Sequence, residues 1–254
     1  MPMENAVSLS INNKIGTLQI NNTALSNALS RAMMTDIADT LEQLNRDDSV
    51  RVIVIQSQGQ KTFCAGASLK ELSTLSSDEE ATHFFSGFAH ILIRMQQMKK
   101  LIIGRIQGKV VGGGLGIVAG CDYVIAHQNA AVKLSELSIG IGPFVIAPAV
   151  TRKIGATAFE ELSLAATQWR NANWSMQKGL YAEIAQDFDT LDEKVQERAN
   201  EFAAYPIEAV KTLRAWHWKN TANWHIELFE NAAITGKLAR QETTQSKLKS
   251  YFKK

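Results

Sequence analysis

The chain has 254 residues, which corresponds to one or two domains of ordinary size. With 45% hydrophobic and 20% charged residues, its composition excludes a disordered chain, a collagen-like repeat and a coiled coil. The net charge is only +2, which argues against a nucleic-acid partner because such proteins usually present a strongly basic face.

The first part of the chain alternates strand patterns with a helical pattern. Residues 7–11 and 15–20 nearly alternate apolar and polar side chains around Asn12-Asn13-Lys14, which predicts a β-hairpin. Residues 30–46 have apolar side chains at helical spacing, and residues 50–56 form a short β-branched run typical of a buried strand. Strand, helix and strand in this order indicate an α/β fold.

The middle of the chain continues the alternation. Ser77 and Glu80 have the spacing of a capping box and predict a helix with Phe84 and Phe88 on its apolar face. After the glycines at 112–114, the apolar residues that follow can continue as a helix. Three further short strands are predicted, over residues 101–106, 122–126 and 132–134.

The last part of the chain has a different pattern. From about Asp189, apolar residues recur at helical spacing and no strand signal follows. We therefore predict an α/β core over residues 1–188 and a C-terminal helical region over residues 189–254.

Cysteine content and hydropathy indicate the type of protein. Cys64 and Cys121 are too few for a disulfide framework and leave a single bridge open. The N-terminus lacks a basic segment followed by an apolar one, so no secretory signal is expected. The longest uncharged apolar runs, residues 110–121 and 139–150, are shorter than the ~20 residues of a membrane span. We expect a soluble, cytoplasmic protein without a membrane partner.

Two segments of small residues follow predicted strands. Residues 63–72 read Phe-Cys-Ala-Gly-Ala-Ser-Leu-Lys-Glu-Leu, and residues 108–116 read Gly-Lys-Val-Val-Gly-Gly-Gly-Leu-Gly. Each can be a tight turn or a place of close packing, but each can also turn backbone N–H groups toward a ligand. The second is not a P-loop, because no Lys-Ser/Thr follows its glycines. Two N–H donors that converge on one oxygen would form an oxyanion hole.

These segments, in this order and spacing, resemble the crotonase superfamily, the enoyl-CoA hydratase/isomerase family, over essentially the whole chain. Three further matches are Asn27-Ala28-Leu29 after the hairpin, residues 134–140 (Leu-Ser-Glu-Leu-Ser-Ile-Gly) and residues 151–155 (Thr-Arg-Lys-Ile-Gly). The resemblance implies an α/β fold with a crotonase-like β-β-α superhelix core and a C-terminal helical trimerisation region. It also implies an acyl-CoA thioester substrate, a homotrimer or a hexamer built as a dimer of trimers, and no cofactor, since coenzyme A is part of the substrate.

The resemblance also assigns roles to individual residues. The backbone N–H groups of Ala67 and Gly113 would hold the thioester oxygen, and Glu136 would be the general acid/base. The residues expected to contact substrate or coenzyme A are Ala65, Gly66, Ser68, Leu69, Lys70, Gly112 and Lys247. For Lys247 a solvated basic tail, with Lys249, Lys253 and Lys254, is an equal alternative. No spacing typical of metal ligands is present, so we expect no metal.

The number of carboxylates bears on the reaction. The best-known hydratases of the family use two glutamates, and this chain has Gly116 at the first position and Glu136 at the second. Burial of Glu136 among apolar neighbours would raise its pKa as acid/base catalysis requires; a surface loop is the alternative. One carboxylate is enough to move a double bond, which favours an enoyl-CoA isomerase.

Residues 140–150, in contrast, are similar to a hydratase branch that acts on branched substrates such as methylglutaconyl-CoA in leucine degradation. We therefore expect an enoyl-CoA hydratase, with a Δ3-Δ2 enoyl-CoA isomerase as the alternative. A non-catalytic protein that binds CoA esters is a further alternative, because the first glutamate is missing and because Ser26 and Thr244 replace residues that would contact coenzyme A in some relatives.

Overall fold

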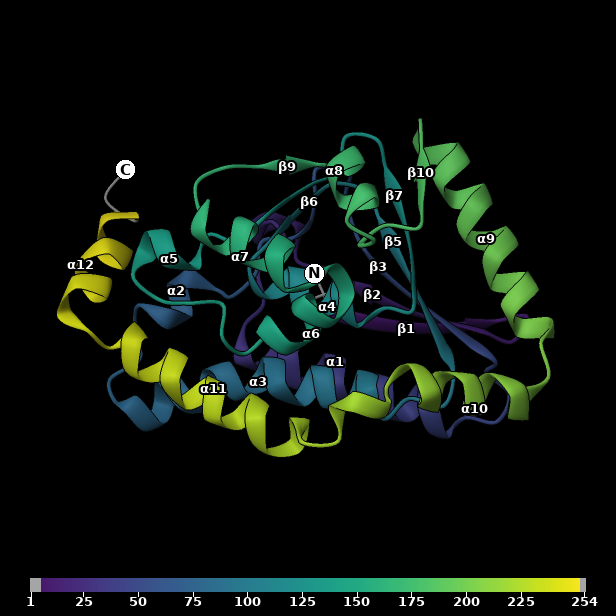
Figure 1. Cartoon of the computed structure of the whole chain (residues 1–254), viewed down its shortest axis with the longest axis horizontal. Helices are drawn as coiled ribbons and strands as arrows, with labels where there is room; N and C mark the ends of the chain where they lie inside the picture. The colour runs from purple at the N-terminus through teal and green to yellow at the C-terminus, as the bar shows by residue number, and fades with distance from the viewer. Residues whose placement is uncertain (1–5, 252–254) are drawn as a thin grey trace, which may run out of the picture.

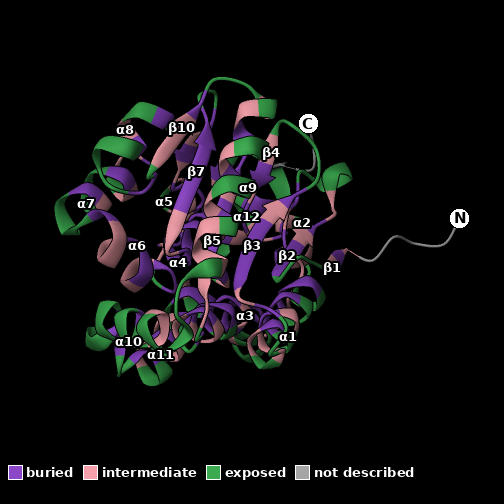
Figure 2. Cartoon of the chain, turned by 90° about the vertical axis from the view of Figure 1, so that its right-hand side faces the viewer, coloured by how far each residue is buried: buried purple, intermediate pink, exposed green. Residues whose placement is uncertain are grey.

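The computed structural model describes residues 6–251, and its centre is a six-stranded sheet in the order β1-β2-β3-β5-β7-β10 (Figure 1). The predicted hairpin forms its antiparallel edge, and every other neighbouring pair in this sheet is parallel. Its strands are β1 (Val7–Asn12), β2 (Ile15–Ile20), β3 (Val52–Ser57), β5 (Leu101–Ile106), β7 (Tyr123–His127) and β10 (Glu183–Ala185). Figure 2 shows β3 and β7 buried along much of their length, as strands covered on both faces should be.

A second, four-stranded sheet has the order β4-β6-β8-β9. Its strands are β4 (Thr62–Cys64), β6 (Lys109–Val111), β8 (Ala131–Lys133) and β9 (Arg170–Asn171). After each of β3, β5 and β7 the chain enters this small sheet and then forms a helix. This repeated β-β-α unit confirms the predicted fold class. Strands β4, β6, β9 and β10 have only two or three residues, so sequence periodicity did not reveal them as separate strands.

Two long helices confirm the patterns read from the sequence. Helix α1 (Arg31–Arg46) begins after Ser30, whose hydroxyl accepts a hydrogen bond from the Met33 N–H. Helix α3 (Asp78–Gln96) begins after Ser77, which accepts from the Glu80 N–H. The Glu80 carboxylate in turn reaches back over the start of the helix and accepts a hydrogen bond from the N–H of Ser76 at 2.7 Å.

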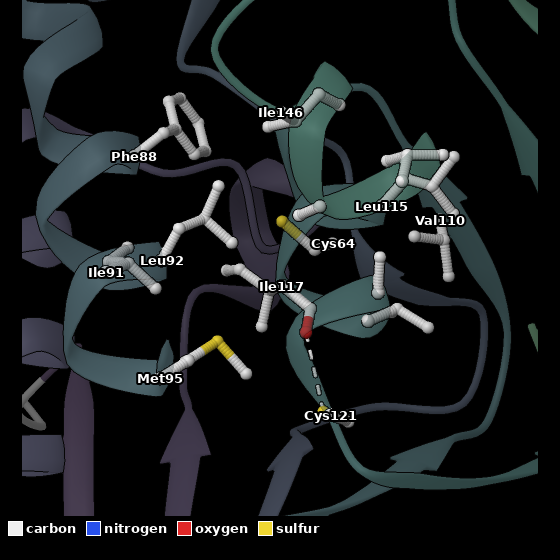
Figure 3. Close-up of a cluster of buried hydrophobic side chains, with 14 of the residues drawn as sticks. Cys64, Phe88, Ile91, Leu92, Met95, Val110, Leu115, Ile117, Cys121 and Ile146 are labelled. Atoms are coloured by element: carbon white, nitrogen blue, oxygen red, sulfur yellow. Dashed lines mark hydrogen bonds between the residues drawn. The ribbon is translucent and has the colours of Figure 1, made fainter. Parts of the chain in front are cut away.

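Six shorter helices join the strands and lie around the small sheet (Figure 1). They are α2 (Leu69–Leu72), α4 (Gly113–Gly120), α5 (Glu136–Ile139), α6 (Ala147–Ile154), α7 (Ala156–Leu164) and α8 (Ala172–Gln177). Figure 3 shows α4 among the buried side chains of α3, with Cys64 and Cys121 nearby. Both cysteines are free and buried, so the single disulfide that the sequence left open is not formed.

The C-terminal helices wrap around this core (Figure 1). They are α9 (Phe188–Ala204), α10 (Ile207–His217), α11 (Trp224–Ala239) and α12 (Glu242–Tyr251). Helix α9 begins beside the predicted boundary and packs Leu191 and Val195 against Val52 and Ile103 of the large sheet. None of the helices within residues 6–251 combines the length and apolar character that a membrane crossing requires.

A buried ion pair fastens α10 to the core. The Arg214 guanidinium is almost fully buried and donates to Asp122 Oδ2 at 2.9 Å. It also donates to the carbonyl oxygens of Met95 and Met98 at the end of α3, and the Trp218 indole donates to Asp122 Oδ1 at 3.2 Å. Asp122 thus has a structural role.

Candidate active site

A cavity of about 280 Å³ lies between the small sheet, α3, α5 and the start of α6. Most of the side chains that line it are apolar: Leu69, Leu72, Phe85, Phe88, Val111, Ile139, Ile141, Val145 and Ile146. Lys133, Ser135, Glu136 and Thr235 add polar atoms to the wall. A mostly apolar cavity with a few polar groups suits a ligand that combines a hydrocarbon part with one reactive polar group.

The two small-residue segments meet at one wall of this cavity. A β-carbon on Gly66, which has φ +84°, would lie 2.8 Å from the carbonyl oxygen of Val111 and 3.3 Å from the amide nitrogen of Gly113. Only glycine permits this backbone conformation together with so close an approach. The fold therefore brings Ala67 and Gly113 into the lining of the same cavity.

The backbone N–H groups of Ala67 and Gly113 are available for a ligand. The carbonyl oxygen of Gly66 accepts from Leu29 N–H, and Ser68 N–H donates to the carbonyl of Leu29, both at 2.8 Å, so Ala67 is fixed on both sides. Gly113 is the first residue of α4, where an N–H has no partner within the helix. Across residues 6–251, no acceptor takes a hydrogen bond from either group. The two donors suit an oxygen that carries negative charge.

Glu136 lies against the backbone that leads into Gly113. A β-carbon on Gly112, which has φ +53°, would lie only 2.8 Å from Glu136 Oε1. The Gly112 N–H donates to the carbonyl oxygen of Lys133 at 3.0 Å, which ties this turn to the strand that precedes Glu136. The carboxyl group and the two N–H donors therefore share one end of the cavity.

The carboxyl group of Glu136 is largely shielded from water. Its Oε2 atom is buried and has no hydrogen-bond partner within the described part of the chain, although the residue as a whole is partly exposed. Burial raises the pKa of this carboxyl group to about 7, because the charged form loses its hydration. Near neutral pH both protonation states are populated, so the group can accept a proton and return it.

Helix α12 packs behind the short helix that carries Glu136. The Thr244 hydroxyl donates to the carbonyl oxygen of Gly140 at 3.2 Å, and Lys247 Nζ donates to the carbonyl of Ser138 at 3.2 Å. Thr244 and Leu248 are fully buried in this contact region. Helix α12 therefore holds α5, and the glycine that ends it, in place through these contacts.

The remaining residues predicted to contact substrate divide into two groups. Ala65, Gly66, Leu69 and Gly112 line the cavity together with the two N–H donors. Ser68, Lys70 and Lys247 do not: the Ser68 hydroxyl caps α2 by accepting from Glu71 N–H, Lys70 is exposed on α2, and Lys247 is exposed on α12. Lys253 and Lys254, named with Lys247 as a possible basic tail, lie outside the described residues.

Gly116 is buried and does not itself line the cavity, but it packs against the wall residue Ile146. A β-carbon at Gly116 would lie 2.4 Å from Cγ2 of Ile146, the residue just before α6. In the view of Figure 3, Ile146 lies between Phe88 of α3 and Leu115 of α4. Among the described residues, Glu136 is therefore the only carboxylate on the cavity wall.

Among the wall residues that the sequence analysis did not name as site residues, Ile146, Thr235 and Lys133 matter most for the chemistry. Ile146 directly precedes α6, and Thr235 comes from the distant helix α11. Lys133 precedes Glu136 by three residues and lies in a strand beside the glycine turn. Its closeness to Glu136 in the sequence could have identified it as a wall residue. Residues 6–251 contain no group of histidine, cysteine or acidic side chains arranged to hold a metal ion.

Comparison with known proteins identifies the chain's relatives. A family model described as enoyl-CoA hydratase/isomerase matches residues 10–254. A "Probable enoyl-CoA hydratase" of Bacillus subtilis is 30% identical over 82% of this chain and 80% of its own length. A "Crotonyl-CoA hydratase" of Syntrophomonas wolfei is 29% identical over 76% of this chain and 74% of its own. The crystal structure of an enoyl-CoA hydratase from Bacillus halodurans shares the fold, with a TM-score of 0.88 at 19% identity over 96% of this chain and 99% of that one.

Proposed function

The chain belongs to the enoyl-CoA hydratase/isomerase family, and we propose that it hydrates an enoyl-CoA thioester with Glu136 as its single acid/base. The observation that carries the proposal is the common location of three groups. The buried Glu136 carboxyl and the unpaired N–H groups of Ala67 and Gly113 lie at one end of an apolar cavity. A thioester oxygen at the two donors would put the carbons of the acyl group within reach of the carboxyl.

In the proposed reaction Glu136 transfers a proton twice, and the two N–H donors hold the thioester oxygen between these transfers. The Glu136 carboxylate accepts a proton from water as the water oxygen bonds to C3 of the thioester. The electron pair of the C2=C3 bond moves onto the thioester oxygen, where Ala67 and Gly113 donate hydrogen bonds worth on the order of 3–4 kcal/mol each. Protonated Glu136 then returns the proton to C2 as the carbonyl forms again.

A second candidate is isomerisation of a 3-enoyl-CoA, and the packing of Ile146 against Gly116 favours it. Because that wall offers no second carboxylate to hold a water molecule, Glu136 would instead take a proton from C2 and return it at C4. The double bond would move to C2=C3 through the same enolate. A non-catalytic role in binding CoA esters remains the third possibility.

The acyl group and the CoA contacts are part of the proposal. The resemblance of residues 140–150 supports a branched substrate such as methylglutaconyl-CoA. We propose Ser68, Lys70 and Lys247 as residues near coenzyme A outside the acyl cavity.

We also propose assembly as a homotrimer or a hexamer. The support is a set of exposed apolar side chains on α10 and α11, namely Leu213, Trp216, Ile226 and Ile234. Light scattering coupled to size exclusion tests this point, and a monomer at micromolar concentration would contradict it.

Product analysis tests the reaction. The purified protein is incubated with crotonyl-CoA, 3-methylglutaconyl-CoA and, separately, a 3-enoyl-CoA, and products are identified by mass spectrometry. A gain of one water on a 2-enoyl ester supports hydration, whereas a shifted double bond at constant mass supports isomerisation. Binding of the esters with no product of either kind would favour the non-catalytic alternative.

A further inference from the structure

Lys133 and Lys109 both contact the ring of Trp169 beside the acyl cavity. Lys133 Nζ lies 4.5 Å and Lys109 Nζ 5.2 Å from the ring centroid of Trp169, which just precedes β9. Lys133 pairs with Val111 in the register of β6 and β8, and both of these residues line the cavity. Lys109 does not line it. The two lysines thus share an aromatic partner but differ in access to the cavity.

The charge on Lys133 is not compensated within the described chain. Neither Lys133 nor Lys109 forms an ion pair with any carboxylate of residues 6–251. Lys133 is also the one cationic side chain on the cavity wall in that part of the chain. Glu136 lies on the same wall but is not paired with it. A cation at a mostly apolar cavity favours a ligand that carries an anionic group.

We propose that Lys133 binds a carboxylate on the acyl group, so that the favoured substrates are CoA thioesters of dicarboxylic acids. This inference rests on the proposed acyl-CoA function and names its substrate class. Trp169 is a positioning residue, because its ring holds the ammonium group by a cation–π contact.

The position of Lys133 favours an acyl carboxylate over a phosphate of coenzyme A. Its carbonyl oxygen accepts from Gly112 N–H, directly before the proposed thioester-oxygen donor Gly113. The phosphates of coenzyme A are separated from the thioester by the whole pantetheine arm. A carboxylate a few carbons along the acyl chain stays near the reacting atoms.

The test measures binding of two saturated thioesters, so that it does not depend on turnover. Glutaryl-CoA carries a distal carboxylate and butyryl-CoA does not. Isothermal titration calorimetry gives the Kd of each for the wild type, Lys133→Met, Lys133→Arg and, as a matched control, Lys109→Met. Circular dichroism and thermal unfolding establish that each variant is folded.

We expect Lys133→Met to weaken glutaryl-CoA binding on the order of tenfold or more, as for loss of a charged hydrogen bond, and to leave butyryl-CoA within about twofold. Lys133→Arg should restore most of the glutaryl-CoA affinity, and Lys109→Met should change neither Kd. An equal loss for both thioesters would assign Lys133 to coenzyme A and overturn the inference, as would no loss for either. If the selective loss is seen but no enoyl ester is converted, the inference stands and the proposed function fails.

Discussion

Ile146 occupies the space that a side chain at position 116 would need, with its Cγ2 atom 2.4 Å from the β-carbon position of Gly116. The two residues therefore depend on each other: the glycine leaves room for the isoleucine, and the isoleucine forms part of the cavity wall. A glutamate side chain at position 116 would have to displace Ile146. Because Glu136 is the one carboxylate on the wall among the described residues, it carries out every proton transfer in the proposed reaction.

The Gly116–Ile146 contact predicts coupled stability effects. Gly116→Ala should lower the free energy of unfolding by about 1–3 kcal/mol, because the new methyl group overpacks against Ile146. Ile146→Ala should cost about 2–5 kcal/mol through the cavity it leaves. The double variant should be more stable than the sum of the single effects predicts, because the closest clash is removed. Urea unfolding of all four proteins measures the coupling, and strict additivity would contradict the packing described.

Substitution of Gly112 should lower the catalytic rate much more than its loss of folding stability can account for. A β-carbon there would lie 2.8 Å from Glu136 Oε1, so Gly112→Ala should displace the carboxyl and lower kcat/KM on the order of 100-fold. Gly155→Ala is the matched control, since Gly155 also has positive φ, at +82°, but has no atom within 4 Å of its β-carbon position. Both should lose about 1–3 kcal/mol of stability to backbone strain, because both backbone conformations are ones that essentially only glycine adopts. Equal activity in the two variants would show that the position of Glu136 does not depend on Gly112.

The buried Glu136 predicts the pH dependence of activity. Burial raises its pKa to about 7, so the base form is populated above that pH and lost below it. For reactions that begin with proton removal, kcat/KM should rise through pH 7 and level off at higher pH. Stopped-flow or steady-state rates from pH 5 to 9 measure the profile. A flat profile over this range would show that the ionisation of Glu136 does not control the reaction.

The Arg214–Asp122 pair predicts how the C-terminal region unfolds. Arg214→Met leaves Asp122 buried without its partner and should cost about 3–5 kcal/mol. Lys211→Met removes the exposed pair with Glu208 on the same helix and should change stability by less than about 1 kcal/mol. Thermal unfolding compares the two variants. Similar effects would mean that the buried pair does not fasten α10 to the core.

Much of the fold was accessible from the sequence because its longer elements have clear periodicity. The hairpin, α1 and α3 lie close to the predicted ranges because their apolar residues recur at the period of one buried face. Strands β3 and β5 also lie close to the predicted ranges, because each is a short, nearly continuous apolar run buried on both faces. In the small sheet only β8 was predicted, from the apolar run over residues 132–134, whereas β4, β6 and β9 have two or three residues, which is too short for any period to appear. Their positions depend on tertiary pairing instead.

The candidate site likewise has features that the sequence revealed and features that it did not. The small-residue segments around Ala67 and Gly113 and the position of Glu136 were found because each forms a recognisable local motif. The contact of Ile146 with Gly116, and the entry of Thr235 into the cavity from α11, join residues far apart in the chain. No local pattern in a single sequence reports such contacts. Lys133 stands between these cases, because its strand was predicted but its place on the cavity wall was not.

Replacement of Glu136 by glutamine tests whether this residue is the single acid/base of the reaction. The change keeps the size of the side chain and removes its proton exchange, so turnover should fall on the order of 100- to 10,000-fold. We would follow conversion of crotonyl-CoA by mass spectrometry, with butyryl-CoA binding and thermal unfolding as controls for an intact site. We expect the wild type to add one water to crotonyl-CoA and Glu136→Gln to form almost no hydrated product. Both proteins should bind butyryl-CoA equally well. Hydration at the wild-type rate by the variant would contradict the assignment of Glu136 as the single acid/base.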